Sequence, residues 1–153
     1  DRAMIYATWA KIALRQNKLT IAQQQIEKAR KLEPHVPAWT IIEASIQKRD
    51  GHPERAIELL TALPQVALDD PETMRLLAES YGMIGRPEDA ASRMVDFATV
   101  HSKDELAPQA AFDAAVWLER AKLREDAVLW GRRARDLGHK QAQGWLDSLP
   151  KVD

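Results

Sequence analysis

The sequence predicts an all-α fold in which short helical hairpins follow one another along the chain. Apolar residues recur at helical spacing in successive stretches, which indicates amphipathic helices. The turn residues recur as well: Gly51 to Glu54 reads Gly-His-Pro-Glu, and Gly85 to Glu88 reads Gly-Arg-Pro-Glu. The spacing between Gly51 and Gly85 is called the repeat period below. The residue one repeat period before Gly51 is Asn17, and asparagine tolerates the left-handed backbone that such turns need. A fixed period of this length is typical of a repeat protein.

Alanines follow the same period and predict where the helices cross. Ala10, Ala44 and Ala78 form one column, and Ala22, Ala56 and Ala90 form another; after three extra residues both columns continue with Ala115 and Ala127. Small residues at a crossing let two helix backbones approach closely. A larger residue at one of these positions is expected to overpack the crossing at a cost of about 1–3 kcal/mol.

Together these residues resemble the tetratricopeptide repeat, a helix-turn-helix unit of about 34 residues. The resemblance is strongest in the first and third units, which carry Tyr6, Trp9-Ala10, Ala13, Ala22, Ile26 and Pro34, and Met74, Leu77-Ala78, Tyr81, Ala90 and Met94. In the second unit Glu43 and Gln47 replace large residues of the family pattern, and in the fourth unit Gly131 does so.

The resemblance implies a right-handed α-α superhelix of about four hairpins, formed by a single domain over residues 1–153. We expect the repeats near residues 3–36, 37–70, 71–104 and 108–141, with a C-terminal capping helix near 140–149 that shields the last apolar face. The chain opens inside a helical pattern without an initiator methionine, so we interpret it as a fragment of a longer protein.

Several local features predict how individual helices begin and pack. We expect the first helix over about residues 2–16, with its Met4, Ile5, Trp9 and Ile12 stripe in the core or facing a missing neighbour. Capping boxes are predicted at Thr20 with Gln23 and at Ser102 with Glu105. Asp70 is the expected cap before Pro71, and Pro53 suits the first position of a helix.

Composition excludes several classes of protein. The chain has 22 basic and 23 acidic residues, whereas a general nucleic-acid binder is normally strongly basic. No apolar run is long enough to span a bilayer, which argues against direct membrane insertion. Because cysteine is absent, disulfides, thiolate metal sites and cysteine nucleophiles are excluded, while the cellular compartment stays unknown.

The sequence carries no pattern that predicts catalysis, a metal site or a cofactor. His35, His52, His101 and His139 fall in separate predicted turns without metal-ligand spacing. His101, Ser102 and Asp104 have the residue types of a hydrolase triad, but they belong to one loop, whereas a triad normally combines distant segments. We therefore expect a protein that is not an enzyme and needs no cofactor.

The best candidate site is the concave groove that the first helices of stacked hairpins line. In the family that the sequence resembles, this groove binds peptide segments of partner proteins. The residues on the helix face next to the packing stripe are expected to line this groove: Lys11, Arg15, Ser45, Lys48, Arg49, Arg75, Glu79, Phe112, Val116, Glu119 and Arg120. Arg15, Lys48 and Arg49 would be electrostatic anchors, and Phe112 with Val116 would supply apolar contact.

The distribution of charge favours an acidic ligand. Residues 1–53 carry nine basic and five acidic side chains, and residues 54–113 carry five basic and twelve acidic ones. A basic N-terminal part favours an acidic peptide or a C-terminal carboxylate. The asparagines of the family's chaperone-binding carboxylate clamp are replaced by Lys11, Ser45, Glu79 and Val116, so a receptor for chaperone tails is not expected.

The sequence therefore predicts an interaction scaffold that binds a protein or peptide segment in its groove. The main alternative is a structural segment of a longer repeat array, which acts by end-to-end contact or by self-association through the N-terminal helix. A third hypothesis, an enzyme or a carbohydrate-binding repeat, is disfavoured because the tryptophans fall mostly on predicted packing faces.

Overall fold

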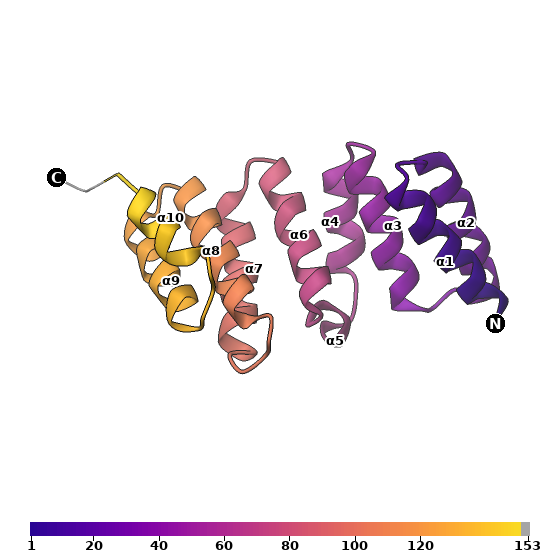
Figure 1. The fold of residues 1–153 in the computed structure, drawn as a ribbon. Helices are drawn as coiled ribbons and strands as arrows, with labels where there is room; N and C mark the ends of the chain where they lie inside the picture. The colour runs from indigo at the N-terminus through magenta and orange to yellow at the C-terminus, as the bar shows by residue number, and fades with distance from the viewer. Residues whose placement is uncertain (151–153) are drawn as a thin grey trace. The chain divides into compact units, whose positions relative to one another are not determined.

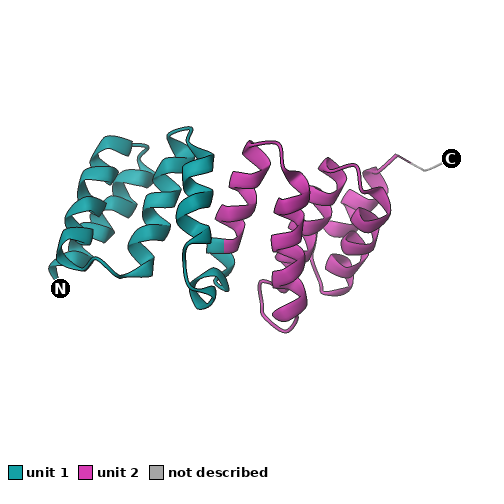
Figure 2. Ribbon diagram, turned by 180° about the vertical axis from the view of Figure 1, so that it is seen from behind, with its two compact units in different colours: residues 1–73 teal, residues 74–153 magenta. Residues whose placement is uncertain are grey.

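The computed structural model describes residues 1–150, which are all-α and form ten helices arranged as sequential hairpins (Figure 1). The contacts divide the chain into two compact units, Asp1–Thr73 and Met74–Asp153 (Figure 2). The first five helices belong to unit 1: α1 (Arg2–Arg15), α2 (Leu19–Leu32), α3 (Pro37–Arg49), α4 (Pro53–Thr61) and α5 (Gln65–Leu68). The sixth, α6 (Pro71–Met83), begins in unit 1 and continues in unit 2. The remaining helices are α7 (Pro87–Val100), α8 (Ala107–Arg120), α9 (Arg124–Asp136) and α10 (Ala142–Ser148).

The hairpin turns repeat one backbone device. Asn17, Gly51 and Gly85 have positive φ, and so does Lys122, which continues the same column after the three-residue insertion. In each turn the next amide N–H donates to the carbonyl five residues earlier, at 2.9 Å, as Lys18 does to Ala13. This bond satisfies one of the carbonyls that the end of a helix leaves without a partner. The turn predicted from the period is thus confirmed and extended to Lys122.

The alanine columns lie where the sequence predicts. All eight alanines of the two columns are fully buried. In unit 1 the core combines alanines of α1 and α2 with larger residues of α2 and α3: Ala3, Ala7, Ala10, Ala13, Ala22, Ile26, Ala29, Trp39, Ile42 and Ile46. Small residues on both helices of the first hairpin let the two backbones approach closely.

The expectation that the large residues of α1 lie in the core is wrong. Met4, Ile5, Trp9 and Ile12 are 54%, 63%, 50% and 48% exposed, because α1 turns its alanine face toward α2 and α3. The stripe is exposed instead, and the alternative that it faces a missing neighbour stays a prediction.

Two of the predicted caps are also wrong. The second helix begins at Leu19, so Thr20 lies inside it, and no side chain caps it. The eighth helix begins at Ala107, and Asp104 rather than Ser102 accepts a backbone bond there, from the Leu106 amide at 2.8 Å.

The other two local predictions are confirmed. Asp70 accepts hydrogen bonds from the Thr73 amide and hydroxyl, both at 2.9 Å. Pro53 opens α4, where its missing amide proton leaves no carbonyl without a partner.

Departures from the repeat pattern are compensated locally. Glu43, which replaces a large residue on α3, forms an ion pair with Arg30 of α2. Gly131, which replaces one on α9, leaves room for Trp145 and Leu146 of α10, and a Cβ at Gly131 would meet both side chains. The expected capping helix is therefore present, and the missing side chain at Gly131 is what admits it.

Candidate functional site

In unit 1 the predicted groove residues lie toward the C-terminal ends of α1 and α3. Lys11 and Arg15 of α1 are exposed. On α3 the Ser45 hydroxyl donates to the Ile41 carbonyl at 3.1 Å, and Arg49 Nη1 donates to the Leu14 carbonyl of α1 at 2.5 Å. The bond from Arg49 ties the two helix ends together and brings its guanidinium beside the last turn of α1.

These cations also have a local structural role. Arg15 occupies the last turn of α1, and Lys48 and Arg49 occupy the last turn of α3. Positive charge at a helix C-terminus interacts favourably with the helix dipole, typically by about 0.3–1 kcal/mol. The C-terminal ends of α1 and α3 are therefore basic for a structural reason. The same positive charge is available to an anionic ligand.

In unit 2 most of the predicted groove residues contact other side chains of the chain. Arg75 and Glu79 of α6 form an ion pair at 4.0 Å. Glu119 of α8 pairs with Arg124 at 2.5 Å, and the Arg120 guanidinium lies over the Trp117 ring at 4.6 Å from its centroid.

Phe112 and Val116 of α8 are both half-buried. The Phe112 ring stacks on His139 at a centroid distance of 4.2 Å and meets the edge of Trp145 at 5.8 Å. Aromatic rings thus cover Phe112 on two sides. Less of its apolar surface is open to a ligand than the sequence analysis expected.

The structure adds two polar residues that the sequence reasoning missed, Gln109 and Asp113, and brings His139 beside them. Asp113 on α8 accepts a hydrogen bond from Gln109 Nε2 at 2.8 Å. The Oε1 atom of Gln109 lies 3.1 Å from Nε2 of His139, in the turn after α9. With Arg75 and Glu79 these residues form a polar cluster within unit 2: Arg75, Glu79, Gln109, Asp113 and His139.

The electrostatics of this polar cluster are set by burial. Burial raises the pKa of the Asp113 carboxyl, against the opposing effects of its bond from Gln109 and the nearby Arg75 charge. Burial also lowers the pKa of His139, while the Asp113 charge opposes that shift. The signal for Asp113 in the sequence is a carboxylate between two alanine pairs of a helix.

Several histidines and carboxylates of the described residues are engaged in local contacts. In residues 1–150 no group of three or more metal-ligating side chains gathers. Within the loop of His101, Ser102 and Asp104, the Asp104 carboxylate bonds to the Leu106 amide and the His101 ring stacks on Phe97. No helix of the described chain is both long and apolar enough to cross a membrane.

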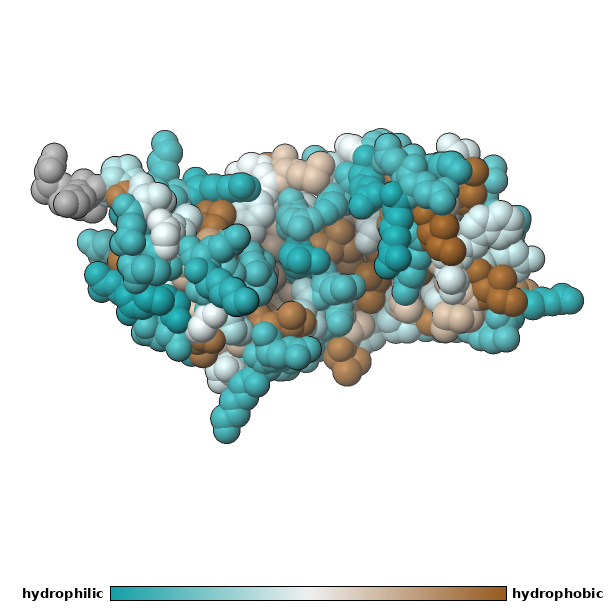
Figure 3. Space-filling model, in the orientation of Figure 1, coloured by the Kyte–Doolittle hydropathy of each residue, from teal (hydrophilic) through white to brown (hydrophobic). Residues whose placement is uncertain are grey.

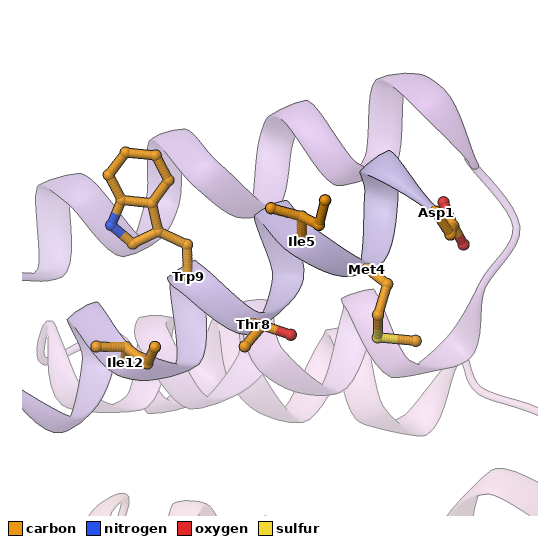
Figure 4. A pocket seen from close by; sticks show the side chains of 6 residues that line it. All are labelled: Asp1, Met4, Ile5, Thr8, Trp9 and Ile12. Atoms are coloured by element: carbon orange, nitrogen blue, oxygen red, sulfur yellow. The ribbon is translucent and has the colours of Figure 1, made fainter.

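A second surface lies on α1. The side chains of Met4, Ile5, Trp9 and Ile12, hereafter the apolar face of α1, project from one side of the helix together with Thr8 (Figure 4). With Asp1 they line a shallow, mostly apolar depression. Hydrophobic residues show among polar ones over the N-terminal helices, at the right of Figure 3.

Comparison with known proteins shows the fold. The sequence matches no known protein family and no curated protein. The structure is similar to the crystal structure of MamA, a protein that contains tetratricopeptide repeats, with a TM-score of 0.51 and 17% sequence identity. The similarity covers 99% of this chain and 98% of that one. The chain thus has a tetratricopeptide-like helical repeat fold.

Proposed function

We propose that the chain is a protein-interaction scaffold that binds a partner segment on the first helices of its hairpins, and that the partner segment is acidic. The fold supports the general role, since tetratricopeptide-like folds generally mediate protein–protein interactions. The observation that carries the specific proposal is the basic end of the first two hairpins in unit 1, where Arg15, Lys48 and Arg49 occupy two neighbouring last turns.

The chemistry of unit 1 favours carboxylates as the ligand groups. A guanidinium and an ammonium side by side bind carboxylates through charge-assisted hydrogen bonds, which are shorter and stronger than neutral ones. Lys11 is exposed on the same helix as Arg15 and adds to the positive charge. In unit 2, Phe112, Val116 and the polar cluster offer aromatic, amide and charged groups to the same kind of extended segment.

The proposal is tested with labelled synthetic octapeptides rich in Asp and Glu, compared with Lys-rich peptides of the same length, by fluorescence anisotropy. The acidic peptides are expected to bind and to weaken with added salt. The variant Lys48→Glu/Arg49→Glu is expected to lose about tenfold or more in affinity, or about 1.4 kcal/mol. Amidation of the peptide C-terminus shows whether a terminal carboxylate is recognised.

Controls separate lost binding from lost folding. The matched variant Lys18→Glu/Lys31→Glu makes the same change of net charge on α2 and its turn, and it should bind like the parent. Because Arg49 holds the Leu14 carbonyl, thermal unfolding is compared first, and Lys48→Glu alone serves as the variant that keeps this bond. Equal affinity for acidic and basic peptides, or equal loss in both double variants, would refute an acidic-ligand site in unit 1.

A second function, a segment of a repeat assembly that associates through its N-terminal helix, is favoured by the apolar face of α1. Large apolar side chains that are about half exposed and contiguous on one helix typically mark an interaction surface. Self-association that depends on concentration and is abolished by Met4→Glu supports this function, and a monomer at every concentration excludes self-association.

A further inference from the structure

Exposed apolar side chains gather on the apolar face of α1 more than on any other helix of residues 1–150. This helix carries four of the large apolar side chains that are exposed, and no other described helix carries more than two. Ile5, Trp9 and Ile12 follow one another at helical spacing, and with Met4 they project from one side of the helix (Figure 4). A contiguous surface of this kind typically marks an interaction site.

The register of this face is that of a surface that helices cover. The residue one repeat period after Ile12 is Ile46 of α3, which is 2% exposed in a core that it shares with alanines of α1 and α2. After the three-residue insertion the same column continues with Trp117 of α8, whose ring lies against Gly82 of α6. In both units a large side chain of this column therefore packs with small residues of a neighbouring helix. The apolar face of α1 has the register to pack against such a helix.

The edges of the apolar face are basic. The helix α1 contains no acidic residue, and its three basic residues are all exposed: Arg2, Lys11 and Arg15. Because successive residues of a helix are turned by about 100°, Arg2 lies on the edge of the face that Trp9 forms, and Lys11 lies on the opposite edge with Met4. Arg15 lies at the C-terminal end. A ligand of this face therefore meets apolar side chains in the middle and positive charge on both edges.

Charge complementarity favours an acidic helix as the ligand of this face. A second copy would place its own basic edges against these, and like charges brought together weaken association. An amphipathic helix with Asp and Glu along its flanks would meet opposite charge on both edges. The seam between α2 and α3 already combines apolar packing with one such ion pair, between Arg30 and Glu43. Asp1 also lines the face, and its carboxylate accepts a hydrogen bond from the Ala3 amide at 3.0 Å as the N-cap of α1.

We propose that the apolar face of α1 docks an acidic amphipathic helix of a partner protein; this rests on the second function above, association through the N-terminal helix, and names the partner's chemistry. The docked helix packs Ala or Gly against Ile5 and Ile12, as the helices within each unit do. Its Asp and Glu side chains pair with Arg2 on one edge and with Lys11 and Arg15 on the other.

The probe is a labelled synthetic helix of about five turns, with Ala and Leu on one face and Glu on the other, hereafter the Glu helix. Its binding to the chain is measured by fluorescence anisotropy. One matched peptide replaces every Glu by Lys, and another keeps the composition but shuffles the order so that no apolar face forms. The Glu helix is expected to bind about tenfold or more tightly than either matched peptide, and added salt should weaken it. Equal binding of the Glu helix and the Lys peptide would overturn the proposal.

Neutral substitutions test the apolar part of the face. Ile5→Asn/Ile12→Asn removes apolar surface without a change of charge and should lower the affinity for the Glu helix about tenfold or more. Val100→Asn/Leu129→Asn, at two exposed apolar residues of unit 2, is the matched control and should bind like the parent. Thermal unfolding is compared first, to show that each variant folds. Full affinity in Ile5→Asn/Ile12→Asn would place the Glu helix elsewhere on the chain and refute the site.

The basic edge and the position of the ligand are tested separately. Arg2→Glu should weaken the Glu helix severalfold, whereas Lys140→Glu, at an exposed residue of unit 2, should not. Because the chain contains no cysteine, Thr8→Cys can carry one environment-sensitive dye in the middle of the face. Its emission should shift to shorter wavelength when the Glu helix binds, and the same dye on Thr20→Cys of α2 should not respond. An unresponsive dye at position 8 would also refute the site.

Further readouts distinguish this docking site from the two functions above. A parent that self-associates through α1 but does not bind the Glu helix would overturn the docking site and leave the second function standing. Binding of the face to phosphatidylglycerol vesicles in place of the Glu helix would also overturn it. A parent that neither self-associates nor binds the Glu helix would overturn both. Lys48→Glu/Arg49→Glu should lose the acidic octapeptides and keep the Glu helix, and loss of both ligands would place the Glu helix at the basic end of unit 1 instead.

Discussion

Asp113 is a charged residue that the fold holds in an unfavourable setting. Its carboxylate lies between two alanine pairs of α8 and is satisfied by Gln109, while burial raises its pKa. A raised pKa means that the folded state binds the proton more tightly than the unfolded chain does. The ionised form at neutral pH therefore costs folding free energy, and this cost disappears when the group is protonated in both states.

The variant Asp113→Asn tests this at the scale of one residue. An amide can still accept the bond from Gln109, so the variant is expected to have a higher Tm than the parent at pH 7. The advantage should vanish as the pH falls below about 3.8, the ordinary value for this group, because the parent carboxyl is then protonated in both the folded and the unfolded state.

Thermal unfolding across this pH range measures the difference. The exposed Asp96→Asn is the control and should change Tm little at either pH. A variant that is less stable than the parent at neutral pH would show that the charge of Asp113 stabilises the fold through Arg75 or His139.

At the scale of the helices, packing depends on small residues placed opposite large ones. The Trp117 ring of α8 packs against Gly82 of α6, and a Cβ at Gly82 would overlap that ring. The Arg120 guanidinium lies over the same ring, which limits how far the ring can shift. Glycine lowers helix propensity, so its presence at position 82 needs a reason. That reason is the close approach of α6 and α8, each the first helix of its hairpin.

Gly82→Ala is expected to destabilise the protein by about 1–3 kcal/mol through overpacking. Gly144→Ala is the matched control, since a Cβ at Gly144 of α10 meets nothing within 4 Å. There the gain in helix propensity should stabilise the chain by up to about 1 kcal/mol. Urea unfolding measures the free energy of unfolding of both variants. A neutral or stabilising effect of Gly82→Ala would mean that the Trp117 ring does not occupy this site.

At the scale of the molecule, the first and last hairpins are finished differently. The outer face of α1 leaves four large apolar side chains exposed, whereas α9 is covered by α10. Trp145 links this cover to the rest of unit 2, since its ring contacts both the Gly131 site and Phe112. The helix α10 thus covers an apolar face of α9, as the predicted capping helix was expected to do.

Trp145→Ala should expose the apolar surface of α9 and destabilise the protein by about 2 kcal/mol, below the 3–5 kcal/mol typical of a fully buried tryptophan because Trp145 is half-buried. Leu129→Ala, at a residue that is 62% exposed on α9, should have little effect. Calorimetry and light scattering report the loss of stability and any new self-association. An unchanged Tm would show that α10 is not needed to cover α9.

Sequence alone determined the repeat and the turns that separate its helices. The repeat period located the left-handed turns and the alanine columns, because each depends on a backbone conformation or a size limit that few residue types satisfy. The capping helix was predicted instead from its own apolar residues. The candidate groove residues were placed on first helices by the same register, and their role in binding stays a prediction. Glu43, off-pattern in the sequence, is explained only by its ion pair with Arg30.

Tertiary structure alone decided which of two apolar stripes on α1 packs inward. Both stripes have helical spacing, and periodicity does not distinguish an alanine face from a face of Met4, Ile5, Trp9 and Ile12. The close approach of α1 and α2 selects the small side chains and leaves the large ones outside. The polar cluster around Asp113 likewise depends on residues from α6, α8 and the turn after α9, whose proximity is set by packing between hairpins and has no signature in a local window of sequence.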